Sequence, residues 1–334
     1  MKAPIVLHRN GDIVPVRRDS DVVFISGRLD KETVRASTRR LYASKLAKVE
    51  RLGYTLPLYD HDLVRFIEGL ATNHTYSTIV GYVSAVKWYH HQHDLPTPDR
   101  YGLVKQSMKS LRKLKTEAGE QPTKAAPLVN DDLKLISDFY QKAPSARNDR
   151  NRIIIMLMYY AALRRQELVN LNIGDLWFSN RGVAITLRVT KNNKNHVFIG
   201  RNEDEPDLCV VSSLETFIAE FRADCEKDSP LFLSVHSSGR TFKNSRLTTN
   251  AVSDLVKYTM SQIGSQHADQ YSGHSPRRGY VTDAVQLNEN VIEISSNARM
   301  SVEVVKSYAE VSGSNVTDGI MHKMAEKRKT KTSN

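Results

Sequence analysis

The chain has 334 residues, of which 40% are hydrophobic, and this is enough for about two folded domains. The formal net charge of +11 favours a polyanionic partner, with nucleic acid ahead of a membrane surface. Two cysteines, Cys209 and Cys225, exclude a disulfide framework, and no apolar run approaches the roughly eighteen residues that span a bilayer, so we expect a cytoplasmic protein.

Residues 1–30 show no sustained period and are predicted to form a basic arm that is flexible or partly extended. Apolar residues then recur at helical spacing, and Gly53 ends the first run. Four helices are predicted, over residues 37–52, 60–71, 77–91 and 102–114. They would form a small all-helical domain at residues 31–117.

The end of this domain is strongly basic. Its basic residues are Lys105, Lys109, Arg112, Lys113 and Lys115. Lysine and arginine at this density suit a phosphate backbone, which carries little base information, although a solvated helix face is the alternative. Residues 118–127 lack apolar periodicity and are predicted to be a linker that can cross a DNA duplex.

A second domain is predicted over residues 128–334, mainly helical with a small β-sheet. The predicted elements are helices over 130–140 and 150–163, a strand over 183–189, a turn at 191–195, a strand over 197–199, a helix over 214–221, an extended run over 230–233, a polar loop over 237–249 and a helix to about 263. The polar loop carries Arg240, Lys243 and Arg246.

Two motifs place cations and a carboxylate where a phosphate could bind. Arg164 follows a buried apolar run, and Glu167 lies one helical step later, where it can orient the guanidinium. His274 and Arg277 form an H-x-x-R pattern at a predicted helix start, with Ser275 as N-cap and Pro276 as first helical residue. The helix dipole and free N–H groups there also favour an anion. Alone, this second motif is more often a helix start with solvated charges, because such short patterns are common.

A short helical pattern over residues 302–308 carries Tyr308. An arginine, a lysine in a predicted hairpin, H-x-x-R and then a tyrosine, in that order, resemble the tyrosine recombinase (phage integrase) family with its Cre-like and Xer-like members. The resemblance spans about residues 34–327. It implies an integrase-type α+β catalytic domain behind an N-terminal helical, SAM-like core-binding domain that forms half of a DNA clamp.

The resemblance also implies roles for single residues. Tyr308 would be the nucleophile and form a covalent 3′-phosphotyrosyl link, while Arg164 and Arg277 bind the nonbridging phosphate oxygens. His274 would manage the tyrosine proton or hold a phosphate oxygen. Lys191, with Lys194 as the alternative, would protonate the departing 5′-oxygen. The implied DNA-contacting residues are Arg39, Arg40, Lys87, Lys105, Lys109, Arg112, Lys113, Lys115, Arg240, Lys243, Arg246 and Arg278. Neither a metal nor another cofactor is expected.

One position departs from the family pattern. Nine residues before its tyrosine the family usually carries His or Trp, and here Arg299 stands there. We expect this arginine to donate to the phosphate and activity to persist, slower or dependent on a partner. Tyr271 and Tyr280 lie nearer to His274 in sequence, but the family spacing favours Tyr308 as nucleophile.

The resemblance predicts a site-specific recombinase for integration, excision or dimer resolution. It would act as a homotetramer on two double-stranded sites built from inverted half-sites. Val316, Ile320 and Met324 form one stripe of a predicted C-terminal helix, which would pack on its own domain or, as in Cre-like recombinases, on a neighbouring protomer. The alternatives are a DNA-binding protein of this fold without catalysis, and a DNA-relaxing or hairpin-forming enzyme with the same site.

Overall fold

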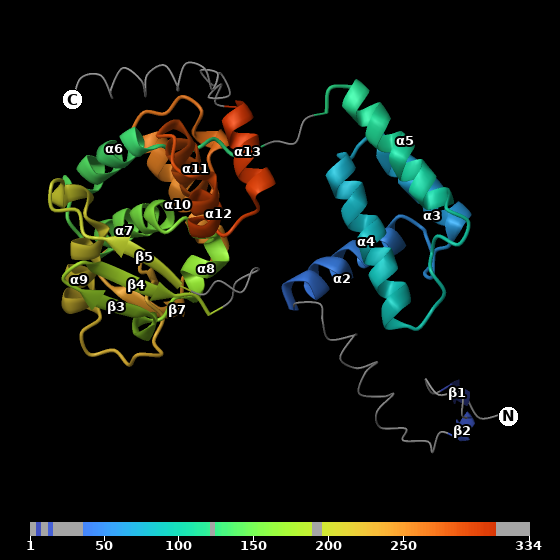
Figure 1. The fold of residues 1–334 in the computed structure, drawn as a ribbon, viewed down its shortest axis with the longest axis horizontal. Helices are drawn as coiled ribbons and strands as arrows, with labels where there is room; N and C mark the ends of the chain where they lie inside the picture. The colour runs from blue at the N-terminus through green and yellow to red at the C-terminus, as the bar shows by residue number, and fades with distance from the viewer. Residues whose placement is uncertain (1–4, 8–12, 16–35, 121–123, 189–195, 312–334) are drawn as a thin grey trace, which may run out of the picture. The chain divides into compact units, whose positions relative to one another are not determined.

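The structure is a computed structural model that describes residues 5–7, 13–15, 36–120, 124–188 and 196–311. It divides into two compact units, residues 1–122 and 123–334, with the boundary inside the predicted linker (Figure 1). Near the start of the chain, β1 (Ile5–Leu7) and β2 (Ile13–Pro15) pair antiparallel. The rest of the predicted arm lies outside the described residues.

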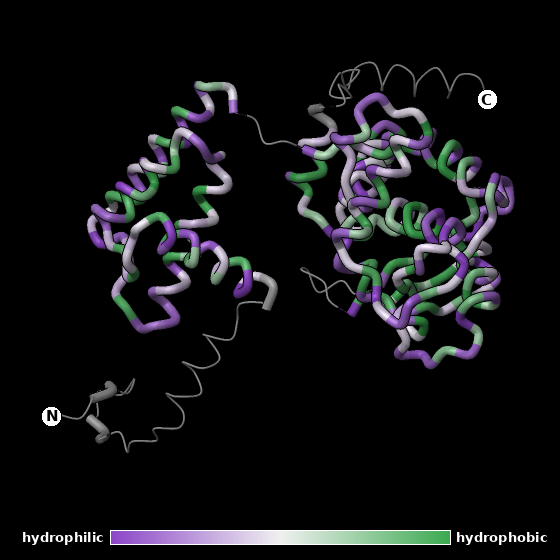
Figure 2. Tube along the Cα trace, turned by 180° about the vertical axis from the view of Figure 1, so that it is seen from behind, coloured by the Kyte–Doolittle hydropathy of each residue, from purple (hydrophilic) through white to green (hydrophobic). Residues whose placement is uncertain are grey.

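The described part of the first unit contains four helices: α2 (Ala36–Arg51), α3 (Asp60–Ala71), α4 (Tyr76–Gln92) and α5 (Leu103–Glu117). Each lies within a few residues of its predicted range. Their apolar faces meet in a core that includes Phe66, Ile79 and Val86, and polar and apolar residues alternate along the helices (Figure 2). The sequence pattern was sufficient here because each helix buries a single stripe.

Two local contacts fix where these helices begin. The Thr75 hydroxyl accepts a hydrogen bond from the Thr78 amide at 3.3 Å and caps α4. The Asp99 carboxylate accepts from the amides of Val104 and Lys105 at 3.1 Å each, which satisfies two of the free donors at the start of α5. The basic face of α5 is thereby held in one orientation on the first unit.

The second unit contains the remaining elements in chain order. They are α6 (Asn130–Gln141), α7 (Ala146–Tyr160), α8 (Arg165–Asn170), β3 (Leu176–Ser179), β4 (Gly182–Thr186), β5 (His196–Gly200), α9 (Val210–Phe221), β6 (Leu233–Val235), β7 (Phe242–Arg246), α10 (Thr249–Gln262), α11 (Ser275–Gln286), α12 (Val291–Asn297) and α13 (Val302–Val311). Helices predominate, and the predicted mainly α fold with a small sheet is confirmed.

Helix α7 is the central element of this unit, and α6, α9 and α11 pack around it (Figure 1). Its residues 153–158 are all buried, so it is apolar on every side rather than amphipathic. The antiparallel sheet β3-β4-β5 has Val183 opposite Ile199 and Ile185 opposite Val197, and it contributes one face to the same core. None of the described helices has the length and apolar content needed to cross a bilayer.

Several predicted boundaries in this unit were wrong. Helix α7 stops at Tyr160, not at residue 163, because Ala162 adopts a positive φ of 45° and turns the chain while remaining buried. It also begins earlier, since the Ser145 hydroxyl accepts from the Asn148 amide. The predicted polar loop at 237–249 contains β7, and β3 was not foreseen, because short strands with exposed polar residues give little periodic signal.

Candidate active site

Arg164 is held by the start of its own helix. It is the N-cap of α8, and its amide donates to Glu167 Oε2 at 2.8 Å. Its Nη1 donates to Glu167 Oε1 at 2.6 Å, which confirms that the carboxylate three residues later orients the guanidinium. Burial alone would raise the pKa of Glu167, but the Arg164 amide and the charges of Arg299 and Arg164 outweigh it and lower the pKa. The carboxylate is therefore ionised.

Arg277 lies in the first turn of α11 and is 7% exposed. Its Nη1 donates to the Ala162 carbonyl at 2.5 Å, and its Nη2 donates to the Ala298 carbonyl. The positive φ of Ala162 directs its carbonyl to this arginine, so the turn after α7 serves the site. Burial, followed by the charges of Arg164 and Arg299, lowers the pKa of Arg277 to about 9, which leaves it protonated at pH 7.

The helix start at this motif differs by one residue from the prediction. His274 is the N-cap, and Ser275 is the first helical residue. The Ser275 hydroxyl accepts from the Ser272 amide at 2.9 Å, so it closes the preceding turn instead of capping α11. A glycine is required at position 279 of α11, because the Leu128 carbonyl packs against the helix there and any Cβ would collide with it. These contacts fix the direction in which His274 and Arg277 leave the backbone.

His274 lies among three arginines. Although the residue is exposed, desolvation by neighbouring protein atoms lowers the pKa of its imidazole, and the charges of Arg165, Arg277 and Arg164 lower it further. The imidazole is therefore neutral at pH 7, with one nitrogen available as an acceptor. A neutral ring can take up a proton from a nearby hydroxyl.

We expect the His274 ring to titrate below the ordinary histidine value of about 6.5 in the ligand-free protein. Because its pKa is lowered on folding, its contribution to stability is present above pH 6.5 and is lost as the pH falls below that value. Carbon-13 NMR of the histidine Cε1 position, assigned with His274→Gln, measures the midpoint. A midpoint at or above 6.5 would contradict the electrostatics described above.

Tyr308 is placed by a small hydrophobic cluster. Helix α13 is anchored by Val305, which is fully buried against α11 and α12 together with Val281 and Ile294. Tyr308 follows one helical step later and packs on the edge of this cluster. The guanidinium of Arg278 lies over the Tyr308 ring, 5.1 Å from its centre, in a cation–π contact.

One cavity of about 740 Å³, which we call the arginine cavity, brings these residues together. It is lined by Arg164, His274, Arg277 and Tyr308 among others. They come from the starts of α8 and α11 and from α13, and Arg164 and Tyr308 are 144 positions apart in the sequence. The arrangement offers guanidinium groups for an anion, a neutral imidazole and a phenol side by side. It can bind a phosphate and present a tyrosine hydroxyl to it.

Arg299 borders this cavity but is bonded differently from the expectation. Its residue is 2% exposed, and its guanidinium donates to the carbonyls of Ala161, Ala162 and Asn297 and to Glu167 Oε2. The side chain is therefore directed at groups of the protein interior. Its main chain has a φ of 50°, and its carbonyl accepts from Arg164 Nη2 at 2.8 Å.

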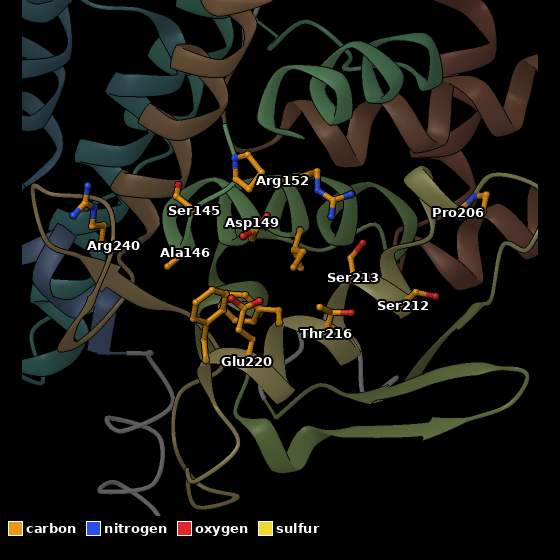
Figure 3. A pocket seen from close by; sticks show the side chains of 14 residues that line it. Ser145, Ala146, Asp149, Arg152, Pro206, Ser212, Ser213, Thr216, Glu220 and Arg240 are labelled. Carbon is orange, nitrogen blue, oxygen red and sulfur yellow. The ribbon is translucent and has the colours of Figure 1, made fainter. Parts of the chain in front are cut away.

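The remaining predicted residues lie elsewhere. Lys191 and Lys194 lie outside the described residues. Arg240 and Lys243 are exposed, and Arg240 borders a separate cavity of about 670 Å³ between α7 and α9, opposite Asp149 and Glu220 (Figure 3). The guanidinium of Arg246 donates to the carbonyls of residues 169 and 171 and to Asn172, so it ties β7 to the end of α8.

On the first unit, the predicted DNA-contacting residues Arg39, Arg40, Lys87, Lys105, Lys109, Arg112 and Lys113 are exposed, whereas Lys115 is half-buried and paired with Glu120 at 3.3 Å. Sequence analysis missed Lys257, which lines the arginine cavity from α10, and Arg165, whose Nη1 donates to Ser253 at 2.6 Å. Nothing in the helical pattern of α10 distinguishes Lys257 from a solvated lysine.

Known proteins share this fold and sequence pattern. Residues 128–309 match the phage integrase family. An integrase/recombinase XerD homologue of Selenomonas ruminantium is 25% identical over 284 residues, which cover 81% of this chain and 79% of that protein. The Cre recombinase of Escherichia phage P1 is 22% identical over 240 residues, or 69% of each chain.

Two solved structures have similar folds. The Tn1549 transposon integrase in complex with circular intermediate DNA superposes with a TM-score of 0.59 at 15% identity and covers 91% of this chain and 97% of that chain. The XerH recombinase bound to a palindromic difH substrate gives a TM-score of 0.56 at 15% identity, over 80% and 72% of the two chains. The family match covers more than half of the chain and includes Arg164, His274, Arg277 and Tyr308. The chain therefore belongs to the phage integrase family, the tyrosine recombinases, which cleave and rejoin DNA.

Proposed function

We propose that this protein is a site-specific recombinase whose Tyr308 cleaves one DNA strand and forms a covalent 3′-phosphotyrosyl intermediate. The observation that carries the proposal is the single cavity that joins Arg164, His274, Arg277 and Tyr308 from three separate helices. A site that only binds the DNA phosphates would need the cationic side chains but not the tyrosine hydroxyl. A phenol beside the partly exposed Arg164, the buried Arg277 and a neutral imidazole supports strand transfer instead.

The reaction can be written from these residues. The Tyr308 hydroxyl oxygen attacks the phosphorus as the bond to the 5′-oxygen breaks. His274, which is neutral, takes the phenol proton or donates to a phosphate oxygen, and Lys191 gives a proton to the leaving 5′-oxygen. Arg164 and Arg277 stabilise the charge that builds on the nonbridging oxygens. The reverse attack by a 5′-hydroxyl of a partner strand rejoins the DNA, so the tyrosyl ester conserves the bond and no ATP or metal is required.

The experiment that tests this proposal is covalent trapping. DNA fragments from the protein's own genomic neighbourhood are screened by footprinting for inverted half-sites. The protected site is then made with a nick that lets the freed 5′-end diffuse away. A protein–DNA adduct that survives denaturing electrophoresis in EDTA without ATP is expected. Binding without any adduct would favour the noncatalytic alternative, and relaxed or hairpin products without strand exchange between two sites would favour the relaxing enzyme.

We further propose that the two units, residues 31–117 and 128–334, contact duplex DNA from either end of the 118–127 linker. Support comes from the exposed basic row of α5, in which Lys105 and Lys109 lie one turn apart, and from the net charge of +11. The solved Tn1549 integrase and XerH relatives are themselves DNA complexes. Because its substrate would be DNA, we also propose that the protein lies in the cytoplasm, associated with the nucleoid.

We propose that four protomers assemble on two sites through the C-terminal segment. Its stripe of Val316, Ile320 and Met324 must be covered, and the charged residues after it, Lys327 to Lys331, cannot supply that burial. This segment lies outside the described residues. The proposal therefore rests on the sequence pattern.

Deletion of residues 313–334 separates trans docking from packing on its own domain. If the helix docks on a neighbour, the truncated protein keeps its thermal unfolding midpoint and still occupies single half-sites, but it loses cooperative binding and synapsis. Gel shifts on DNA with one and with two half-sites measure this. Undiminished cooperativity, or a destabilised monomer, would refute docking in trans.

A further inference from the structure

Glu167 is shared between two arginines in the wall of the cavity. Its Oε1 accepts from Arg164 Nη1 at 2.6 Å, and its Oε2 accepts from Arg299 Nη2 at 3.1 Å. The Glu167 and Arg299 side chains are 3% and 1% exposed, whereas the Arg164 side chain is 24% exposed. Of the two arginines on this carboxylate, Arg164 is thus the one that a phosphate in the cavity can reach.

The other contacts of Arg299 lock it in this position. Its Nη2 also donates to the Ala162 carbonyl at 2.8 Å, and its Nη1 donates to the Asn297 carbonyl at 2.9 Å. The Ala162 carbonyl also accepts from Arg277, and the Arg299 carbonyl accepts from Arg164. Arg299 therefore contacts the groups that hold Arg164 and Arg277 in place. Its own guanidinium is buried in the wall of the cavity.

This arrangement limits how Arg164 can pair with Glu167. A guanidinium and a carboxylate prefer two parallel bonds, one from each nitrogen to each oxygen. Oε2 already accepts from the Arg164 amide at 2.8 Å, and Arg299 fills its second acceptor position. The Arg164 side chain therefore bonds the carboxylate through Nη1 alone, and its Nη2 is held by the Arg299 carbonyl. Without the Arg299 side chain, Oε2 would keep only its bond from the Arg164 amide. Its second acceptor position would then be open to the Arg164 guanidinium, which would rotate toward it.

We infer that Arg299 is a positioning residue that acts through Glu167 to aim Arg164 at the scissile phosphate, and that it does not itself bind the phosphate. The inference rests on the proposed strand cleavage at this cavity. It gives Arg299 a different task from the phosphate donation that its sequence position suggested.

A double-mutant cycle tests this directly. The rate of covalent complex formation is measured in single turnover for Arg299→Met, Glu167→Gln and the double variant, at DNA concentrations that saturate binding. Misplacement of a catalytic group by about 1 Å can cost on the order of a hundredfold, so each single variant should lose about tenfold or more. If Arg299 acts through Glu167, the double variant should cleave within about threefold of Glu167→Gln.

Arg165→Met is the matched control, since Arg165 is the next residue on α8 and bonds Ser253 instead of Glu167. Its effect should multiply with that of Glu167→Gln. DNA affinity should be nearly unchanged by Arg299→Met, because the side chain is buried away from the phosphate. If Arg299→Met fails to fold by thermal unfolding, Arg299→Lys replaces it in the cycle, because lysine keeps the charge but cannot bond Asn297, Ala162 and Glu167 together.

The outcomes separate the two claims. Multiplying losses for Arg299 and Glu167, in a protein that still forms the adduct, would overturn the positioning role and leave the proposed function intact. A weakened DNA affinity for Arg299→Met comparable to that of Arg164→Met would have the same consequence. No adduct with the unmodified protein would overturn the proposed function, and the positioning role with it.

Discussion

Replacing Tyr308 with phenylalanine should abolish covalent attachment to DNA and leave site binding nearly intact. The substitution removes only the hydroxyl, and the ring can still pack on the α11–α13 cluster and under Arg278. Without the oxygen nucleophile no phosphotyrosyl bond can form, so the loss should be complete rather than partial. Denaturing gels of the nicked substrate measure the adduct, and gel shifts measure binding.

Tyr271→Phe and Tyr280→Phe are the matched controls for this experiment. Tyr271 lines the same cavity, whereas Tyr280 packs on the cluster beneath Tyr308. Both variants should keep the adduct. An adduct that persists in Tyr308→Phe but disappears in Tyr271→Phe would transfer the nucleophile to Tyr271.

Arg164→Lys and Arg277→Lys should each slow cleavage by about a hundredfold or more, as loss of a transition-state donor does in other enzymes. Lysine keeps the charge but not the planar fork. Arg164 bonds Glu167 and the Arg299 carbonyl at once, and Arg277 bonds two carbonyls of separate segments. A single ammonium cannot make these contacts and also bind two phosphate oxygens.

Single-turnover cleavage rates measure this loss, and thermal unfolding checks that each variant is folded. Arg201→Lys is a suitable control. Arg201 makes a forked pair with Glu215 at 2.8 and 3.0 Å but takes no part in lining the arginine cavity. Its variant should lose the same fork and keep the cleavage rate. Near-normal cleavage in both Arg164→Lys and Arg277→Lys would remove these arginines from the site.

The sequence alone was sufficient for the elements that depend on neighbours along the chain. The helices of the first unit follow from single apolar stripes, and α3 has the predicted bounds. The pairing of Arg164 with Glu167 was also predictable, because residues three apart at a helix start face each other. The family resemblance, carried by the order of a few motifs, is confirmed by the match over residues 128–309.

Only the tertiary structure decided how Arg299 is used. A sequence position nine residues before the tyrosine suggested a phosphate donor, but the direction of a long side chain depends on which acceptors surround it. Here the turn after α7 places two carbonyls, and the start of α8 places a carboxylate, within reach of one guanidinium. These groups are over 130 residues away in sequence. A buried charge must be paired, so the positions of these carbonyls and of the carboxylate determine that the Arg299 guanidinium lies in the wall of the cavity.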